Sequence, residues 1–392
     1  MNIKQDNYKI IIDNYSRDYK IMDSSNNICL KESDAVLSIK SDDEYYQYAS
    51  QIDHMSNVYY NITKRCNLRC SYCYSNNGDA YVSAEDNITI LNKLEELNTK
   101  TATLIGGEPL CHPFINDIIS EVLQRDFEEI CIVTNGTQIQ SLRRNVLMDK
   151  RLFLQISLDG YDEMTNAPTR GKGTFRIVED NIDYLANNNI QFRVMKVITR
   201  DNIDDSLNYF KYFYSKGTIP GFFMVKQVPE SIKPTVDQLE KLIDELFVII
   251  GSADGVFEVV KFAENAMFGV TGFPIAHCGA GISTLTIDPN GDVYPCVKRT
   301  KKSECITNMK LYEAPTHIKD NRRRILQEEI VFGKKGCESC VIRFFCGGGC
   351  RAEEENGKIC EYNCSYFQFA VEKYHKLLVK ELGKEHRYEI ES

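Results

Sequence analysis

Three cysteines in one short segment have the residue type and the spacing that an iron–sulfur cluster requires. Cys66, Cys70 and Cys73 follow the apolar run 58–63 in the order Cys-x3-Cys-x2-Cys. Three thiolates in one loop can bind three irons of a 4Fe–4S cube, which leaves the fourth iron without a protein ligand. A zinc site usually needs a fourth Cys or His nearby, and none lies within ten residues after Cys73. The spacing therefore favours a cube with one open iron, at which a reaction can take place.

A second and denser group of cysteines lies near the C-terminus. Nine of the 15 cysteines occur from residue 278 onward: Cys278, Cys296, Cys305, Cys337, Cys340, Cys346, Cys350, Cys360 and Cys364. CxxC pairs are also common zinc ligands, so a zinc ribbon is the alternative to further iron–sulfur clusters. The number of cysteines, and the lack of histidine in 337–364, favours clusters. Because metal sites compensate for a thin hydrophobic core, this distribution predicts a large domain followed by a small metal-stapled one.

The overall composition is that of an ordinary globular protein, and it excludes several function classes. The chain has 392 residues, 43% apolar and 26% charged, enough for two to three domains. No apolar run is long enough to span a membrane, and the N-terminal segment lacks a secretory apolar stretch. We therefore expect a cytoplasmic protein whose cysteines are thiolate ligands and not disulfides. A formal net charge of −9 argues against a nucleic-acid partner.

The elements that must position the first cysteines alternate between strands and helices. Candidate strands are 58–63, 101–105, 130–134, 152–157, 192–199 and 221–226. Helical patterns lie between them, and the first helix has Ser83 as its N-cap with Asp86 three residues on. Six strand–helix units predict an α/β fold with a parallel sheet or an incomplete barrel. In such folds active residues lie at the carboxyl ends of the strands.

Short polar and glycine-containing motifs follow three of these strands. Gly106-Gly107-Glu108-Pro109 follows the second strand, Thr134-Asn135-Gly136 ends the third, and Ser157-Leu158-Asp159-Gly160 ends the fourth. Each motif alone occurs in many α/β proteins. The order of the three motifs along the chain, together with the cysteine spacing, is more specific than any one of them.

Together, the cysteines and the strand-end motifs resemble the radical SAM superfamily. The resemblance implies a partial (β/α)6 TIM-type barrel in which Cys66, Cys70 and Cys73 are catalytic ligands of a 4Fe–4S cluster. The open iron of that cluster chelates the amino and carboxylate groups of S-adenosyl-L-methionine (SAM). The implied cofactor-binding residues are Tyr72 along the adenine, Gly106 and Gly107 toward the ammonium, Ser157 on the ribose, and Glu108, Pro109, Asn135 and Asp159.

The same resemblance implies the chemistry. A reductant such as flavodoxin or ferredoxin reduces the cluster, which passes an electron to the sulfonium, and a 5′-deoxyadenosyl radical then abstracts a hydrogen from the substrate. The difficult step belongs to the cofactor, and the protein supplies orientation and a dry cavity.

The C-terminal cysteines resemble the SPASM domain of a subset of radical SAM enzymes, which carries one or two auxiliary 4Fe–4S clusters. The family pattern places Cys278, Cys296 and Cys350 on the nearer cluster, and Cys337, Cys340, Cys346 and Cys364 on the distal one. Some relatives, anaerobic sulfatase maturases among them, have one more cysteine six residues before Cys278, where this chain has Gly272. The nearer cluster therefore either has an open iron or recruits Cys305. The distal ligand is either Cys360 or Cys364.

Radical SAM enzymes with SPASM domains mostly modify ribosomally made peptides or proteins. The resemblance therefore implies a peptide maturase, with thioether or carbon–carbon crosslinking as the favoured reaction. The alternatives are a sulfatase-maturase-like oxidation of a Cys or Ser side chain, or a non-catalytic iron–sulfur carrier. About 55 residues precede the first barrel strand, which is short for a winged-helix leader-binding domain, so a separate leader-peptide-binding protein is an expected partner.

These patterns predict five segments along the chain. They are a small β-rich extension (1–54), the barrel (55–230), a helical connector (231–277), the SPASM domain (278–364) and a C-terminal helix (365–392). Within them we expect a helix over 235–250, a β-hairpin around Pro289-Asn290-Gly291, and a closing helix from about 363 to 382.

Several other residues carry weaker signals. Arg170 is expected to bind a carboxylate of cofactor or substrate, or to be a surface cation. Lys226 and Gln227 end the sixth strand and are expected either at the mouth of a cavity or in solvent. Cys29, Cys111 and Cys131 are interpreted as buried small hydrophobic residues, and His112 and His277 as structural. The segment 296–335 has eleven basic and five acidic residues, which indicates a solvated face, or a docking surface for an acidic peptide.

Overall fold

The computed structural model describes residues 2–5, 7–12, 19–25, 29–32, 41, 43–44, 47, 55–75, 77–261, 278–354 and 361–391. Gly272, His277 and Cys360, which enter the sequence predictions, lie outside these residues. The chain forms two compact units. The first comprises Met1–Gln51, Pro229–Gly279 and Leu326–Ser392, and the second comprises Ile52–Val228 and Ala280–Ile325.

Six parallel strands form the centre of the second unit. They are β5 (Asn57–Thr63), β6 (Thr101–Gly106), β7 (Glu129–Thr134), β8 (Leu152–Ser157), β9 (Phe192–Ile198) and β10 (Gly221–Met224). Neighbours in the chain are neighbours in the sheet, and every pair is parallel. The prediction of an α/β fold with a partial TIM-type barrel is confirmed, and all six strands lie where the sequence indicates.

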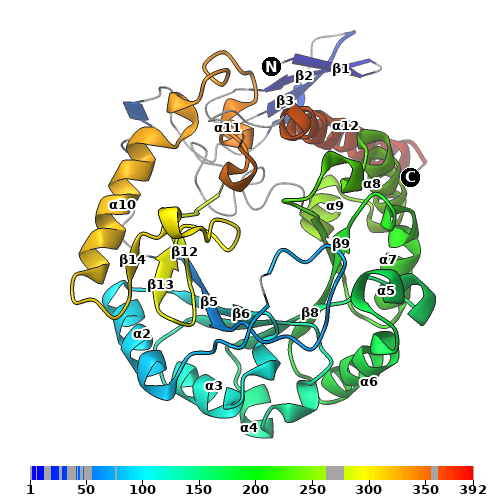
Figure 1. Ribbon diagram of the computed structural model, residues 1–392. Helices are drawn as coiled ribbons and strands as arrows, with labels where there is room; N and C mark the ends of the chain where they lie inside the picture. Colours follow the sequence, from blue (N-terminus) through cyan, green and yellow to red (C-terminus); the bar gives the residue numbers. More distant parts are fainter. Residues whose placement is uncertain are drawn as a thin grey trace. The chain divides into compact units, whose positions relative to one another are not determined.

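Helices cover the outer face of this sheet (Figure 1). They are α2 (Ala84–Glu96), α3 (Ile115–Leu123), α4 (Arg144–Leu147), α5 (Glu163–Arg170), α6 (Thr174–Asn187) and α7 (Ser206–Ser215), with the short 3-10 helices η1 (Pro109–Cys111), η2 (Ile139–Ser141) and η3 (Ile203–Asp205). Alternate residues of β8 (Leu152, Leu154 and Ile156) are buried, as expected for a strand with one face toward helices. Ser83 caps α2 by accepting a hydrogen bond from the backbone of Asp86.

A hairpin from much later in the chain extends the same sheet. β12 (Thr284–Ile287) pairs in parallel with β5. It is followed by β13 (Asp292–Tyr294) and β14 (Thr307–Asn308), both antiparallel to their neighbours. The predicted hairpin is confirmed, but its place beside β5 was not predicted. Helix η5 (Lys302–Glu304) precedes β14, and α10 (Ala314–Glu328) begins in this unit.

The first unit combines an antiparallel sheet with helices. The sheet contains β1 (Asn2–Gln5), β2 (Tyr8–Ile12), β3 (Tyr19–Asp23) and β4 (Cys29–Glu32) in chain order. The other elements are η4 (Glu230–Ile232), α8 (Val236–Ile250), α9 (Ala253–Val259), β11 (Val260–Lys261), η6 (Val331–Gly333), α11 (Arg343–Cys346), η7 (Arg351–Glu353) and α12 (Glu361–Glu391). The β-rich N-terminal part and the helix near 235–250 are confirmed, and the closing helix is longer than predicted.

Ion pairs of the buried Lys373 and a hydrogen bond of Tyr374 connect the helices of the first unit. Lys373 of α12 donates to Glu240 and Asp244 of α8 at 2.8 and 2.6 Å, and Tyr374 donates to Asp254 of α9 at 2.5 Å. This unit therefore joins α8 and α9 with the C-terminal helix. The predicted segments 231–277 and 365–392 contribute to one compact body. Among the helices that the structure describes, none has the length together with the apolar character needed to cross a bilayer.

We predict that Tyr60→Phe destabilises the second unit. Tyr60 is fully buried on β5, and its hydroxyl donates to Oδ1 of Asn87 on α2 at 3.0 Å. Removing the hydroxyl leaves the Asn87 oxygen buried without this partner, which costs about 1–3 kcal/mol. Denaturant unfolding measures the loss. The matched control is Tyr312→Phe, because Tyr312 is 86% exposed; equal stability of the two variants would contradict the assignment.

Candidate active site

The three N-terminal cysteines occupy one loop at the carboxyl end of β5. Cys66 and Cys70 are half-buried and Cys73 is exposed. The backbone N–H of Leu68 points at the Cys66 Sγ at 3.4 Å, and the N–H of Cys73 donates to the Cys70 carbonyl at 3.1 Å. Burial raises the pKa of Cys70 to about 11, and Cys73 and Cys66 act in the same direction. Backbone N–H groups of the loop itself thus contact Cys66 and Cys70.

The donor set fits a cube better than a single ion. Each thiolate of a 4Fe–4S cube binds a different iron, whereas four zinc ligands share one centre. Three thiols in one loop without histidine are the donors that a cube with one open iron requires.

The glycines of the Gly106-Gly107 turn let this turn pack against the cysteine loop. A Cβ on Gly106 would lie 2.5 Å from the Thr63 carbonyl oxygen, and one on Gly107 would lie 2.6 Å from the Arg65 oxygen. The backbone N–H of Gly107 donates to the Thr63 carbonyl oxygen at 2.8 Å. Only glycine allows this approach of two backbones. The expected contact of this turn with an ammonium group stays a prediction.

A buried carboxylate joins three loops at this edge of the sheet. Glu108 is 1% exposed, and its backbone N–H donates to the Arg65 carbonyl at 2.7 Å. Its Oε1 accepts from the N–H of Leu110 at 3.0 Å and the hydroxyl of Thr134 at 2.6 Å, and its Oε2 accepts from the N–H of Asn135 at 2.6 Å. Both oxygens are thus used inside the protein, so we assign Glu108 to positioning.

Asn135 connects the third strand end to the cysteine loop. Its Nδ2 donates to Oδ1 of Asn67 at 2.8 Å, and the Nδ2 of Asn67 donates to the hydroxyl of Thr137 at 2.9 Å. Asn67 directly follows Cys66 in the chain. It had no role in the sequence analysis, and its place inside the Cys-x3-Cys spacing was the signal that could have found it.

A second buried network anchors the other end of the loop. Asp159 is fully buried, and Arg170 donates to it through Nε at 2.9 Å and Nη2 at 3.2 Å. The Tyr72 hydroxyl donates to Asp159 at 2.5 Å, Arg170 also donates to that hydroxyl at 2.7 Å, and the N–H of Val197 donates to Asp159 at 3.0 Å. Arg170 is therefore no surface cation, and the carboxylate that it binds belongs to the protein itself.

The remaining predicted cofactor residues lie at the same edge. Pro109 is buried at the start of η1, and Ser157 is the half-buried last residue of β8. The backbone N–H of Ser71 donates to the Thr169 carbonyl at 3.0 Å, which ties the loop to the end of α5. Contacts of Pro109, Ser157 and the Tyr72 ring with SAM stay predictions.

Four C-terminal cysteines gather in the first unit. Burial raises the pKa of Cys337 to about 11 and that of Cys346 to about 12, and the thiols of Cys340 and Cys364 add to one or both shifts. These four residues are the predicted distal ligands. Gly347, Gly348 and Gly349 all have positive φ between Cys346 and Cys350, a run that only glycine adopts without strain. The four predicted distal ligands thus lie in one unit, and their joint ligation of a cluster stays a prediction.

The predicted nearer set is divided between the two units. Cys278 and Cys350 belong to the first unit and Cys296 to the second, so their joint ligation stays a prediction. Cys305 belongs to the second unit, and its thiol donates to the Thr307 carbonyl at 3.3 Å.

Most of the weaker signals have structural explanations. Basic residues of 296–335 form ion pairs: Arg299 with Glu304, Lys302 with Asp292, Lys310 with Asp86, Arg323 with Asp320 and Lys334 with Glu354. His112 is buried and its Nε2 lies 2.9 Å from the Val82 carbonyl, as predicted. Cys131 is buried and Cys111 half-buried, but Cys29 is exposed, so its prediction was wrong. The exposed edge of β4 explains that error.

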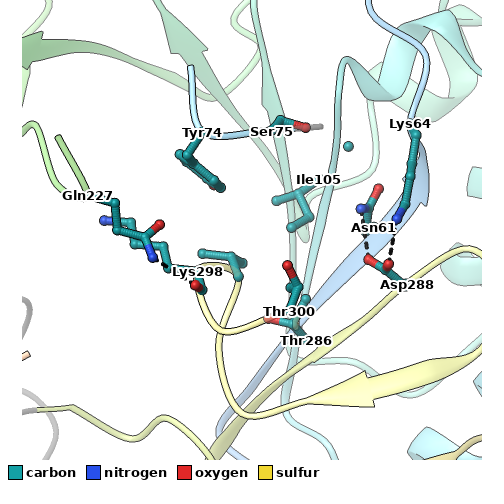
Figure 2. Close-up of a pocket in the computed structure, with 12 residues that line it drawn as sticks. Asn61, Lys64, Tyr74, Ser75, Ile105, Gln227, Thr286, Asp288, Lys298 and Thr300 are labelled. Atoms are coloured by element: carbon teal, nitrogen blue, oxygen red, sulfur yellow. Dashed lines mark hydrogen bonds and ion pairs between the residues drawn. The ribbon is translucent and has the colours of Figure 1, made fainter. Parts of the chain in front are cut away.

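A pocket lies beside the cysteine loop at the carboxyl ends of β5, β6 and β12 (Figure 2). Gln227 lines it with a φ of 59° and donates from Nε2 to the Lys298 carbonyl at 2.8 Å. The predicted cavity-mouth position of Gln227 is confirmed. Lys226 does not line this pocket.

Comparison with known proteins agrees with this site. Residues 60–213 match the radical SAM superfamily. The chain is 25% identical to the mycofactocin maturase MftC of Mycolicibacterium smegmatis over 64% of this chain and 66% of that protein. It is 25% identical to the subtilosin biosynthesis protein AlbA of Bacillus subtilis over 60% of this chain and 54% of that protein. The matched part thus spans less than two thirds of either relative. A probable GTP 3′,8-cyclase of Archaeoglobus fulgidus is also 25% identical, over 63% of this chain and 87% of that protein.

Solved structures share the fold. The chain superposes on anSMEcpe with bound AdoMet and a peptide with a TM-score of 0.67 at 16% identity, covering 84% of this chain and 99% of that chain. It superposes on SuiB of Streptococcus suis bound to S-adenosylmethionine with a TM-score of 0.64 at 16% identity, covering 92% and 99%. The superfamily match shows that residues 60–213 carry a radical SAM domain, and the solved structures share its fold. Enzymes of that superfamily use SAM and a 4Fe–4S cluster.

We predict that Glu108→Gln loosens the cysteine loop. Glutamine replaces one acceptor oxygen by an NH2 group that faces a buried donor, so at least one hydrogen bond is lost at a cost of about 1–3 kcal/mol. Denaturant unfolding and the iron content after reconstitution should both fall. The control is Glu128→Gln, whose side chain is 67% exposed in its ion pair with Lys100. Wild-type values in Glu108→Gln would contradict the positioning role.

We also predict that Arg170→Met leaves Asp159 as an unpaired buried charge. The side chains of Arg170 and Asp159 are 7% and 0% exposed, and breaking such a pair costs about 3–5 kcal/mol. Adding Asp159→Asn should recover part of this loss in denaturant unfolding. Arg176→Met is the control, because the Arg176 side chain is 78% exposed. If all variants unfolded alike, the buried network would have no stabilising role.

Proposed function

We propose that this protein is a peptide maturase that crosslinks a ribosomally made peptide, forming a thioether or another covalent bond. The observation that carries the proposal is the cysteine loop, held at the barrel edge by Glu108 and Asn135. Two relatives, the mycofactocin maturase MftC and the bacteriocin subtilosin biosynthesis protein AlbA, support a peptide substrate. SuiB, which has the same fold with a TM-score of 0.62 and 15% identity, has been solved bound to its precursor peptide SuiA.

The residues at the barrel edge would have separate tasks. Cys66, Cys70 and Cys73 would hold the cluster, and the turn at Gly106 and Gly107, with Tyr72, Pro109 and Ser157, would hold SAM. Glu108, Asn135 and Asp159 would fix the loops that carry those groups. When bound, SAM and the reduced cluster supply the 5′-deoxyadenosyl radical that abstracts a hydrogen atom from the substrate.

Crosslinking also requires an electron acceptor. Forming a bond between two peptide groups removes two hydrogen atoms. One leaves in 5′-deoxyadenosine, and the other leaves as a proton and an electron. Cys337, Cys340, Cys346 and Cys364 would hold a distal auxiliary cluster along the electron's path. Cys278, Cys296 and Cys350 would hold the nearer one, which either keeps an open iron for a substrate thiolate or recruits Cys305.

The partners follow from the same proposal. A low-potential reductant such as flavodoxin or ferredoxin would deliver the first electron. A separate protein would present the leader segment of the peptide. The alternatives are a sulfatase-maturase-like oxidation of a Cys or Ser side chain, and an iron–sulfur carrier without SAM chemistry.

Anaerobic incubation of the reconstituted protein with dithionite and SAM tests the enzyme proposal. We predict that the wild-type protein forms 5′-deoxyadenosine. The Cys70→Ala variant should form none and should contain about four fewer iron atoms per chain. Cys111→Ala is the matched control, because Cys111 lies outside the Cys-x3-Cys-x2-Cys spacing, and it should retain both. Product formation by Cys70→Ala, or none by wild-type protein with intact clusters, would exclude the proposal and favour a carrier.

Co-expression with a candidate precursor peptide tests the crosslink. We predict that each modification lowers the peptide mass by two hydrogen atoms, and that tandem mass spectrometry shows no fragmentation between the linked residues. Oxidation of a serine side chain gives the same mass loss but leaves fragmentation complete. An unchanged mass with incorporated solvent deuterium would indicate epimerisation and contradict the crosslink.

A further inference from the structure

The pocket beside the cysteine loop has a size and a lining that suit a polar group. Its volume is about 140 Å³, and a cavity of about 150 Å³ can hold a benzene molecule. It therefore has room for a group as large as one side chain. Tyr74 and Ser75, which follow Cys73 directly, lie on one side of the pocket, and Thr286 and Thr300 lie on another (Figure 2). Gly106 also lines the pocket.

One wall of the pocket presents a hydrogen-bond acceptor. Asn61 donates from Nδ2 to Oδ1 of Asp288 at 3.1 Å, and Lys64 binds the other oxygen of Asp288 at 2.7 Å. Because a carboxylate only accepts, the amide nitrogen of Asn61 must face Asp288. The Asn61 oxygen then points elsewhere. It is buried, and it has no hydrogen-bond partner among the residues that the structure describes.

A second wall presents a hydroxyl. Thr286 lies on β12, is 1% exposed and lines the pocket. Its Oγ1 is also buried without a partner within the described part of the chain. Figure 2 shows Asn61 beside Lys64 and Asp288, and Thr286 apart from it next to Thr300. Buried polar groups without partners are costly, so both positions favour a ligand that supplies the missing bonds.

The two groups together select one chemistry. The Asn61 oxygen needs a donor, and the Thr286 hydroxyl can donate to an acceptor. The Thr286 hydroxyl can also accept, so a cation could bond to both groups, but the positive charge of Lys298 in the lining disfavours a cationic ligand. Because the two groups lie apart, a neutral ligand that bonds to both carries its donor and its acceptor on different atoms. An amide has this arrangement, whereas a carboxylate offers acceptors only and would leave the Asn61 oxygen unpaired. The charge of Lys298, which also lines the pocket, makes an acidic group the competing ligand.

We propose that this pocket binds an amide group of the substrate peptide, which rests on the proposed peptide substrate. The amide N–H donates to the Asn61 Oδ1, and its carbonyl accepts from the Thr286 hydroxyl. The amide comes from an Asn or Gln side chain or from a main-chain peptide unit. The pocket is then a determinant of which residue is held beside the cysteine loop.

Binding measurements with short peptides test this proposal without turnover. The probes are acetyl-Gly-Xaa-Gly-amide tripeptides with Asn, Gln, Ala, Ser, Asp or Glu at the central position. They are titrated by NMR into the anaerobically reconstituted full-length protein with SAM. We expect the Asn or Gln peptide to bind about five- to tenfold more tightly than the Ala peptide, the effect of one net hydrogen bond. Thr286→Val should remove this preference.

Thr284→Val is the matched control, because Thr284 lies two residues earlier on β12 and does not line the pocket. It should keep the preference. The Ala peptide could bind as tightly as the Asn peptide, with Thr286→Val weakening the binding of both. That result would support the proposal and identify the bound amide as a main-chain peptide unit. Tighter binding of the Ser, Asp or Glu peptide, an unchanged affinity in Thr286→Val, or no binding at millimolar concentration would overturn it.

The wild-type peptide series requires no variant, so a folding defect in Thr286→Val cannot decide the result. The outcome is also separate from the proposed function. Amide binding without 5′-deoxyadenosine formation would leave the pocket intact and remove the radical chemistry. Formation of 5′-deoxyadenosine without amide binding would support the radical chemistry and exclude the pocket proposal.

Discussion

The buried carboxylate of Glu108 is the interaction on which the rest of the site depends. Burial raises the pKa of this group, and three hydrogen bonds from Asn135, Thr134 and Leu110 act against that effect. The charge of a carboxylate inside the protein is tolerated only when such donors surround it. These donors come from two strand ends, while the Glu108 backbone binds the cysteine loop. One residue therefore fixes the relative positions of three loops that come from different parts of the chain.

The pair of Asp159 and Arg170 extends this constraint to the far side of the loop. Tyr72 lies between Cys70 and Cys73 and binds both members of the pair. The loop is thus held from both ends, by Asn67 near Cys66 and by Tyr72 near Cys73, while its thiols remain partly exposed. A fixed loop with accessible thiols is what a cluster with one open iron requires, since the protein must hold three irons and leave the fourth free.

The strands and their end motifs were predictable because they depend on local sequence. The β-branched runs of β5 to β10 alternate with amphipathic helices, and parallel strands place their carboxyl ends at one edge. The distal cysteine group was also predictable, because Cys337, Cys340 and Cys346 are close in the chain. What could not be predicted depends on long-range pairing. Neither the place of β12 beside β5 nor the ion pair between Lys64 and Asp288 leaves a trace in local sequence.

The same distinction explains the protein contacts that the sequence analysis missed. Glu108 and Asp159 were assigned to the cofactor because they stand in motifs at strand ends. Both residues are buried, which sequence alone does not show. Both carboxylate oxygens of each residue accept hydrogen bonds from other groups of the protein. Arg170 was left between a surface position and a ligand contact for the same reason. The amide pocket needs residues from β5 and β12, more than 200 positions apart, and only their pairing in the sheet forms it.

The most direct test of the central claim is electron–nuclear double resonance on the reduced protein with SAM that carries an isotopically labelled amino nitrogen. If Cys66, Cys70 and Cys73 hold a cube with one open iron, the cluster signal will show a coupling to that nitrogen. A cluster signal that SAM leaves unchanged, with no nitrogen coupling, would contradict the account.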